Sequence, residues 1–406
     1  MMTLFQIILS LLVLALLVPV AVLLLQVLAA IGKRAVVIAP GGRRPEVAVL
    51  VPAHNEAQGI AATVAGIRAQ LRAGDRILVV ADNCDDDTAE QALAAGAPVL
   101  ERHDLSARGK GYALDAGVRQ LALSPPEVLI IIDADCRVKA GSITHLACTA
   151  LETQRPVQAL DLMRAPRGAG LKIRIAEFAW IVKNKVRALG FHHLGLPCQL
   201  MGTGMAFPWP LIAQASLANG HLAEDMKLGV ELARAQAAPV FCPEACVISY
   251  FPSTDEAARM QRTRWEHGHM GMIMQEGLPL LWQGIRERNR ALFAMALDMC
   301  VPPLALLTLL SCALFAVTAM NFLIFAYAAP LVLASVLLAA LTLAILLSWQ
   351  RFGQQLLSLK DLFSALAYAC WKLPLYMKFF VNRQLEWVRA RPVSYTHLRA
   401  HETPEH

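Results

Sequence analysis

Two carboxylates, Asp133 and Asp135, follow an apolar run of the chain and are separated by one small residue. Carboxylate oxygens suit a hard divalent cation such as Mg²⁺ or Mn²⁺, whose coordination phosphate oxygens and waters would complete. Without a positive partner the two carboxylates would repel each other, and one of them would tend to stay protonated. The pair therefore predicts a cation at this point, although acidic residues that follow a strand also cap helices.

Two further acidic residues follow other apolar runs. Glu56 ends the stretch VPAHNE at 51–56, and Asp82 lies in VVADNC at 79–84. Their carboxylates could accept hydrogen bonds from a nucleotide base or from ribose hydroxyls. The neighbouring aspartates at 85–87 are better explained as helix-start acids, which the helix dipole favours.

A candidate general base and a candidate phosphate-binding group lie later in the chain. Glu224 and Asp225 open a segment with an apolar helical face, and a carboxylate there can act as a base if it faces a cleft. Helix capping is the alternative role. In QRTRW at 261–265, Arg264 could bind phosphate oxygens bidentately, and Trp265 could stack on a sugar ring. The alternative is a membrane-interface Trp beside an Arg that reaches for water.

Alternating strands and helices are predicted to position these residues. The strands are expected at 47–51, 77–80, 99–101 and 128–132, and the helices at 57–71, 87–95 and 112–123. Such alternation predicts a parallel sheet covered by helices on both faces. Ligands bind at the carboxyl ends of the strands in such sheets. The polar clusters at 54–56, 82–83 and 133–135 all fall at that edge, so we expect a site there.

The composition divides the chain into membrane and soluble parts. Of the 406 residues, 56% are hydrophobic and 17% charged, which is too apolar for an ordinary soluble enzyme. Residues 4–31 contain no charged residue and are long enough for one membrane crossing. Residues 291–349 contain only one charged residue, Asp298, and are long enough for two crossings. The first apolar run is too long for a signal peptide, and no basic residue precedes it. Lys33 and Arg34 follow it instead, which predicts an outside N-terminus and a cytoplasmic central domain.

We therefore expect five segments. They are an N-terminal transmembrane helix at 1–32, a catalytic domain at 45–285, two transmembrane helices at 291–349, an interfacial helix or fourth membrane segment at 355–390, and a non-native tail at 394–406. The tail is polar and His-rich and resembles translated adapter sequence, so it is excluded from the site. The net charge of +6 comes largely from residues that flank the apolar segments, so nucleic acid is not an expected partner.

Three other features of the sequence are not assigned to the predicted site. A basic helical stretch at 165–200 is predicted to be either a solvated helix face or a membrane-surface helix. Cys242 and Cys246 form a close pair without the second pair of a zinc site, so the thiols are read as reduced and structural. His267 and His269 would point to different faces of a helix, so no metal site is expected from them.

The motifs together resemble the membrane-bound branch of the family 2 glycosyltransferases, which includes cellulose, hyaluronan and poly-N-acetylglucosamine synthases. The resemblance covers about residues 45–285 and implies a GT-A fold, a Rossmann-like and mostly parallel α/β sheet, with flanking transmembrane helices. It implies that the nucleotide-sugar donor is held by Glu56, Asp82, Lys110 of GKGYAL, Asp133, Gln261 and Arg264. It further implies that the metal is held by Asp135 and Asp133, that Asp225 beside Glu224 is the catalytic base, and that the acceptor contacts Trp265, Gly202, Thr203 and Gly204.

The resemblance implies an inverting enzyme with Mg²⁺ or Mn²⁺ and a UDP-linked sugar donor. The acceptor would be a glycan or a lipid-linked molecule of the bacterial envelope or an exopolysaccharide, with membrane lipids and export subunits as partners. The enzyme is expected in the bacterial inner membrane as a multi-pass protein. Ala223 replaces the usual Thr or Ser before Glu-Asp, which removes a side chain that could hydrogen-bond the acceptor but leaves the base in place. No FxVTxK gating loop follows QRTRW, and no cyclic-dinucleotide domain fits in the remaining sequence, so cellulose synthase itself is not expected. A ceramide-type single-addition enzyme and a non-catalytic scaffold subunit are the alternatives.

Overall fold

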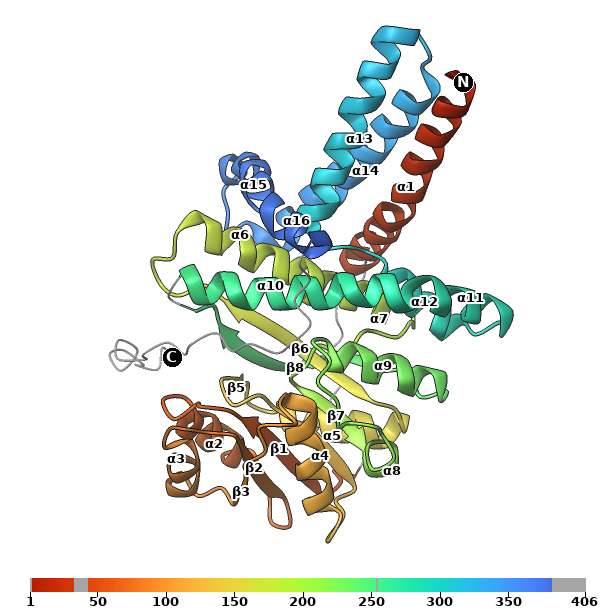
Figure 1. The fold of residues 1–406 in the computed structure, drawn as a ribbon. Coiled ribbons are helices and arrows are strands. Elements are labelled where there is room, and N and C mark those ends of the chain that lie inside the picture. Colours follow the sequence, from red (N-terminus) through yellow and green to blue (C-terminus); the bar gives the residue numbers. More distant parts are fainter. Residues whose placement is uncertain (1, 33–42, 253–254, 382–406) are drawn as a thin grey trace.

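The computed structural model describes residues 2–32, 43–252 and 255–381 (Figure 1). An α/β domain forms one end of the molecule, and three long helices project from the other end. A layer of helices that includes α6 (Leu171–Trp180) and α10 (Asp255–Met272) lies between them. The predicted non-native tail at 394–406 lies outside the described residues.

One mixed sheet of eight strands forms the α/β domain, in the order β3-β2-β1-β4-β7-β6-β8-β5. Strands β3, β2, β1 and β4 are parallel, β7 is antiparallel to both of its neighbours, and β8 is parallel to β6. The edge strand β5 is antiparallel to β8. The bounds are β1 (Val47–Ala53), β2 (Arg76–Asp82), β3 (Val99–Arg102), β4 (Val128–Ile131), β5 (Arg137–Val138), β6 (Val157–Arg164), β7 (Met205–Pro208) and β8 (Val240–Tyr250).

Helices cover both faces of the sheet because the central strands are apolar on both faces. Every residue of β1 and β4 is buried. Val47, Val49 and Val51 pack with α2 (Ile60–Arg68), α3 (Thr88–Ala94) and α5 (Ser142–Thr153). Ala48 and Leu50, which point the other way, pack with α4 (Lys110–Leu121), α8 (Trp209–Ile212) and α9 (Glu224–Arg234).

The predicted α/β fold is confirmed in its first half, where all four expected strands lie within two residues of their expected ends and the helices within three. The second half adds antiparallel pairing that was not predicted. Strand β7, which follows β6 in the chain, lies between β4 and β6 in the sheet and is antiparallel to both. The sheet is therefore mixed, although most of its pairings are parallel.

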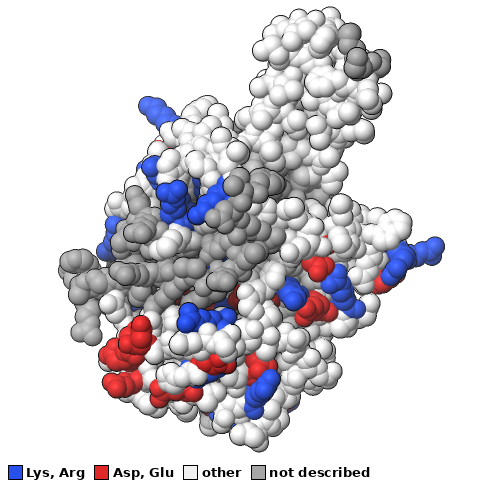
Figure 2. Space-filling model, in the orientation of Figure 1, with Lys and Arg blue, Asp and Glu red and all other residues white. Residues whose placement is uncertain are grey.

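Among the described residues, three helices are long and apolar enough to cross a membrane. They are α1 (Met2–Gly32), α13 (Leu304–Phe325) and α14 (Ala329–Ser348), and none contains a charged residue. On the face drawn in Figure 2, charged side chains gather over the α/β domain and the helical layer, whereas the projecting bundle shows none. The chain after the bundle forms α15 (Leu359–Trp371) and α16 (Leu373–Val381), two short helices beside α6.

The bundle is tied to the domain through Asp298 of α12 (Arg290–Met299). Gln26 of α1 donates a hydrogen bond of 2.6 Å to this carboxylate. Arg187 of the π-helical segment η1 (Ile181–Arg187) forms an ion pair of 2.8 Å with it. All three side chains are buried. Removing one partner of a buried ion pair typically costs about 3–5 kcal/mol, so this junction fixes η1 against the first helix of the bundle.

Candidate active site

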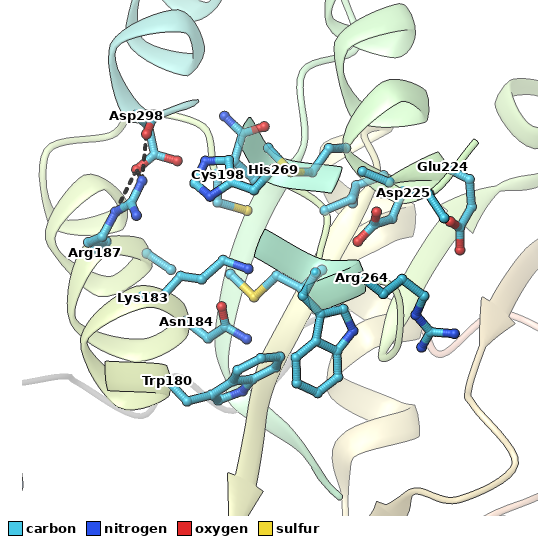
Figure 3. Close-up of a pocket in the computed structure, with 18 of the residues that line it drawn as sticks. Trp180, Lys183, Asn184, Arg187, Cys198, Glu224, Asp225, Arg264, His269 and Asp298 are labelled. Carbon is cyan, nitrogen blue, oxygen red and sulfur yellow. Dashed lines mark hydrogen bonds and ion pairs between the residues drawn. The ribbon is translucent and has the colours of Figure 1, made fainter. Parts of the chain in front are cut away.

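A cavity of about 150 Å³ lies between the carboxyl edge of the sheet and the helical layer. Six of the predicted site residues line it, namely Lys110, Asp133, Glu224, Asp225, Arg264 and Trp265. They come from four separate elements: α4, the loop after β4, the start of α9 and the middle of α10. Figure 3 shows Asp225 and Arg264 on one side of this cavity and Lys183 reaching toward them from the other.

The two aspartates that follow β4 lie at the carboxyl edge of the sheet, where Asp133 lines the cavity and Asp135 is not among the lining residues. Asp133 forms an ion pair with the Lys110 ammonium, and its backbone N–H donates to Thr203 Oγ1 at 3.0 Å. Burial raises the pKa of the Asp135 carboxyl, and the neighbouring charge of Asp133 raises it further. The expected repulsion between the two carboxylates is therefore present, and Lys110 supplies part of the positive charge that they need.

Lys110 is held in place as a fixed cation. Besides its ion pair, its ammonium donates a hydrogen bond of 2.7 Å to the carbonyl oxygen of Gly202. Burial alone would lower its pKa, but Asp133 and then Glu224 outweigh burial and raise the pKa above its ordinary value. The lysine therefore stays charged throughout the neutral range and faces the cavity beside three carboxylates.

Glu224 and Asp225 begin α9 and form a buried acidic pair. Burial raises the pKa of both carboxyls, and the charge of Asp225 raises that of Glu224 further. Lys110 acts in the opposite direction on both. Two adjacent carboxyls with raised pKa values titrate as a pair. Both line the cavity, so either is placed to accept a proton from a hydroxyl bound there.

The loop at 202–204 lies between Asp133 and Asp225. Gly202 has φ +95°, and a Cβ there would lie 3.4 Å from the Asp225 carboxylate, so a side chain would be both strained and crowded. Gly204 has φ +65°, and a Cβ there would lie 2.8 Å from Ala159. Thr203 accepts the hydrogen bond from Asp133. The structure therefore places this loop against the aspartates, and its predicted contact with the acceptor stays a prediction.

The QRTRW segment lies on α10, above the cavity. Arg264 and Trp265 line the cavity, and the Trp265 ring lies 4.7 Å from the ring of Trp180, measured between centroids. Gln261 is not among the lining residues, and its side-chain oxygen is buried without a hydrogen-bond partner in the described part of the chain. Arg262 points away and donates to the Tyr368 hydroxyl at 2.9 Å.

Glu56 and Asp82 lie along the same sheet edge but outside this cavity. Asp82 ends β2 and pairs with Arg102 at 2.6 Å. Glu56 follows β1, and its backbone N–H donates to Thr88 Oγ1 at 2.7 Å. Since β2, β1 and β4 are consecutive in the sheet, Asp82, Glu56 and Asp133 form a row along its edge. Neighbouring strands lie about 4.8 Å apart, so the row spans roughly 10 Å.

Sequence reasoning missed one wall of the cavity, which α6 and η1 form. Trp180, Lys183, Asn184 and Arg187 line it there (Figure 3). Burial lowers the pKa of Lys183. Asn184 donates a hydrogen bond of 2.9 Å to Asp161 of β6, whose pKa burial raises to about 8. The only available signal was the basic stretch at 165–200, which the sequence could not connect to the motifs.

The two histidines of α10 bind backbone carbonyls. His267 Nε2 lies 3.1 Å from the Leu375 oxygen, and His269 Nε2 lies 3.0 Å from the Met299 oxygen. Burial lowers the pKa of His269 to about 3, so this ring stays neutral. In the described part of the chain, no three His, Cys, Asp or Glu side chains are grouped so that they could hold a metal ion.

The fold and the site define an α/β protein with paired carboxylates, four cationic side chains and a buried acidic pair at the carboxyl edge of a mostly parallel sheet. The family described as "Glycosyltransferase like family 2" matches residues 45–268, which is more than half of the chain. The chain belongs to this family, as its motifs indicated.

Curated relatives carry the same description. The chain is 25% identical over 246 residues to "Probable glycosyltransferase YdaM" of Bacillus subtilis, which covers 57% of each chain. It is 39% identical over 100 residues to "Uncharacterized glycosyltransferase Rv0539" of Mycobacterium tuberculosis, covering 25% of this chain and 41% of that one. The chain thus spans about half the length of the curated relatives that it matches.

A solved structure shares the fold over nearly the whole chain. It is the mannosyltransferase PcManGT from Pyrobaculum calidifontis, solved in complex with GDP-Man and Mn²⁺. The match has a TM-score of 0.56 at 19% identity and covers 93% of this chain and 100% of that chain. The predicted GT-A fold with flanking apolar helices is thereby confirmed.

Proposed function

We propose that the chain is a membrane-embedded inverting glycosyltransferase that moves a sugar from a nucleotide diphosphate, UDP in our prediction, to a glycan or lipid-linked acceptor. One observation supports this proposal most strongly: Asp225, at the start of α9, lines the same cavity as Asp133, Lys110 and Arg264. A carboxylate whose pKa burial raises thus shares a cavity with two cations, Lys110 and Arg264, of the kind that can bind phosphate.

In the proposed reaction, Asp225 acts as the base, and Lys110 and Arg264 stabilise the leaving group. Asp225 takes the proton from an acceptor hydroxyl, whose oxygen attacks the anomeric carbon from the face opposite the leaving group. The bond between that carbon and the diphosphate oxygen breaks, and the diphosphate leaves with the electron pair. Lys110 and Arg264 stabilise the negative charge that develops on it. Inversion follows from the single displacement.

The donor would lie along the edge of the sheet. We propose that Glu56 and Asp82 hold the base and ribose, with Arg102 fixing the Asp82 carboxylate, and that the diphosphate reaches Asp133. The row of these residues spans about two strand spacings, roughly 10 Å, which suits an extended nucleoside diphosphate. Gln261 remains a proposed donor contact.

The chemistry of Asp133 and Asp135 fits a divalent ion. The two carboxylates are separated by one residue, and burial and then the charge of Asp133 raise the pKa of Asp135. Lys110, which pairs with Asp133, acts in the opposite direction and offsets this only in part, so a further positive charge would be stabilised here. Because only two carboxylates are present, the phosphates of the donor would complete the coordination. Bound Mg²⁺ or Mn²⁺ would supply further positive charge to the departing diphosphate. PcManGT was solved with an ion and a nucleotide sugar of these classes.

The membrane topology and the pathway belong to the proposal as well. Three apolar helices are present, and the basic residues that flank them in the sequence favour a cytoplasmic catalytic domain. We place the enzyme in a bacterial inner membrane, where envelope or exopolysaccharide synthesis would consume its product and where export subunits could bind it.

A screen of sugar nucleotides tests the proposal. The full chain is reconstituted in lipid nanodiscs with Mg²⁺ or Mn²⁺, and release of the nucleoside diphosphate is measured for UDP- and GDP-linked sugars. We expect release from at least one UDP-sugar and its loss with EDTA. If no donor releases nucleotide although nucleotide binding is measurable, the chain acts as a scaffold and the proposal is wrong.

A further inference from the structure

A second and larger cavity, of about 340 Å³, lies between the helical layer and the base of the apolar bundle. It falls in the range of about 300–1,000 Å³ that small-molecule sites occupy. Its walls are mostly apolar side chains, among them Phe178 of α6, Leu304 of α13 and Leu341 of α14. Two of these walls belong to helices long and apolar enough to cross a membrane.

The second cavity continues the catalytic cavity. Five residues line both of them, namely Trp180, Lys183, Arg187, Trp265 and His269. The close Trp180 and Trp265 rings form the boundary, with centroids 4.7 Å apart. A molecule could therefore have one end among the apolar side chains and the other end beside Asp225.

Most charged groups on the walls of the second cavity already have partners. Glu266 pairs with Lys372, and Arg187 pairs with Asp298. Lys183 differs, because in the described part of the chain its ammonium contacts the Trp180 ring at 5.3 Å and forms no ion pair. Figure 3 shows this side chain pointing into the catalytic cavity. The junction thus offers one cation to a polar group, and the space beyond it is apolar.

We infer that the second cavity holds the hydrocarbon chain of a lipid acceptor, whose polar head enters the catalytic cavity beside Lys183. The inference rests on the proposed function and narrows its acceptor to a lipid. The lipid hydroxyl loses its proton to Asp225, its oxygen bonds to the anomeric carbon, and the nucleoside diphosphate leaves with the electron pair of the broken bond.

The walls favour a lipid over a growing glycan. A glycan in this space would leave its hydroxyl groups without partners, at roughly 1–3 kcal/mol for each buried group. A hydrocarbon chain gains about 0.8 kcal/mol for each CH₂ removed from water, and from a bilayer it exchanges one apolar environment for another. The position of the cavity at the base of α13 and α14 also places it where bilayer lipid is the nearest ligand.

A photolabelling experiment tests the site without any donor. The full chain in nanodiscs is irradiated with hexadecanol that carries a mid-chain diazirine, and labelled positions are mapped by mass spectrometry. We expect label on the cavity walls in α6 and α13. Thr308→Trp, at a part-buried wall position of α13, should reduce this label at least fivefold. Leu310→Trp is the matched control, since Leu310 lies on the same helix and is 42% exposed.

Nucleotide binding, measured by calorimetry, shows that each variant is folded. If Thr308→Trp fails that check, Ala365→Trp fills the same cavity from α15. Equal labelling of the wall positions in the cavity-filling variant and in the Leu310→Trp control would overturn the inference. Because no donor is present, this outcome would leave the proposed sugar transfer untouched.

A transfer assay then separates a substrate from a structural lipid. With the donor found in the screen, radioactive sugar should enter the organic phase, and Thr308→Trp should lose this product while keeping its nucleotide affinity. Product that stays in the aqueous phase as polymer and is unaffected by Thr308→Trp would overturn the inference, even if the label maps to the cavity.

Discussion

The two sides of the catalytic cavity are built in different ways. On the side that we propose for the donor, Asp133 lines the cavity, and Asp82 and Glu56 lie outside it on neighbouring strands of the same sheet edge. On the side that we propose for the acceptor, Trp180 and Trp265 lie 85 positions apart in the chain, on different helices, and meet only through packing. The donor side is therefore held by the backbone of the sheet, whereas the acceptor side depends on how the helical layer sits against the bundle.

Each side contributes one lysine to the same cavity. Lys110 is surrounded by carboxylates and bonded to the Gly202 carbonyl. Lys183 contacts an aromatic ring, and burial lowers its pKa. The difference suggests that Lys110 is set in place before any ligand arrives, whereas Lys183 gains its partner from the ligand. Substitutions at and around these lysines can break or sharpen this division.

The largest effect is expected where the two sides meet. Asp225→Asn should lower turnover by about 10²–10⁴-fold, because the amide cannot accept the proton of the acceptor hydroxyl. Affinity for the nucleoside diphosphate, measured by calorimetry, should change little. Turnover near the wild-type value would show that Asp225 is not the base.

On the donor side, Lys110→Met should weaken nucleotide binding by about ten- to a hundredfold, the equivalent of one charged hydrogen bond of about 1.5–3 kcal/mol. The KM for the donor should rise, and the KM for the acceptor should not. Lys110→Arg keeps the charge and should recover part of the affinity. An unchanged donor affinity in Lys110→Met would remove this lysine from the donor site.

On the acceptor side, Lys183→Met should change the KM for the acceptor and leave the KM for the donor unchanged. We expect the KM for the acceptor to rise by roughly two- to tenfold, since one hydrogen bond to the polar head is lost, about 0.5–1.5 kcal/mol. The donor KM should stay within error of the wild type. If the donor KM rises instead, both lysines serve the diphosphate and the division into two sides fails.

The difference between the donor side and the acceptor side also explains what could be predicted from the sequence. Apolar runs that end in polar clusters revealed the four parallel strands and the row from Asp82 to Asp133, because strand ends in such sheets share an edge. The partner of Asp82, Arg102, was missed although it lies only 20 positions away, since nothing in its neighbourhood marks it as a ligand.

The acceptor side could not be predicted for a physical reason. Trp180 and Lys183 belong to a stretch whose charges are equally typical of a solvated helix face. Their role depends on η1 packing against α1 and α12, and Asp298 fixes that packing. Contacts between segments more than a hundred positions apart leave no local pattern, and neither does the shape of the apolar cavity beside them.

The pH profile reports on the cations around Asp225. Burial raises its pKa above the ordinary value of about 4, and the base must be ionised to accept a proton, so turnover should fall as the pH drops through this raised pKa. Lys110 lowers the pKa of Asp225, so Lys110→Met should move the acidic limb to higher pH. A limb that moves to lower pH in this variant would contradict the assignment.

The smallest effect concerns Asp161, where the sheet meets the acceptor side. Burial raises its pKa to about 8, whereas an unfolded aspartate ionises near 4. Between these values only the folded protein holds the proton, so the free energy of unfolding should fall as the pH rises across this window. Asp161→Asn carries no such proton and can still accept the hydrogen bond from Asn184. Its unfolding temperature should therefore fall less between pH 6 and pH 8 than that of the wild type. An equal fall in both proteins would mean that Asp161 is ionised in the fold and that the contact between β6 and η1 is a charged one.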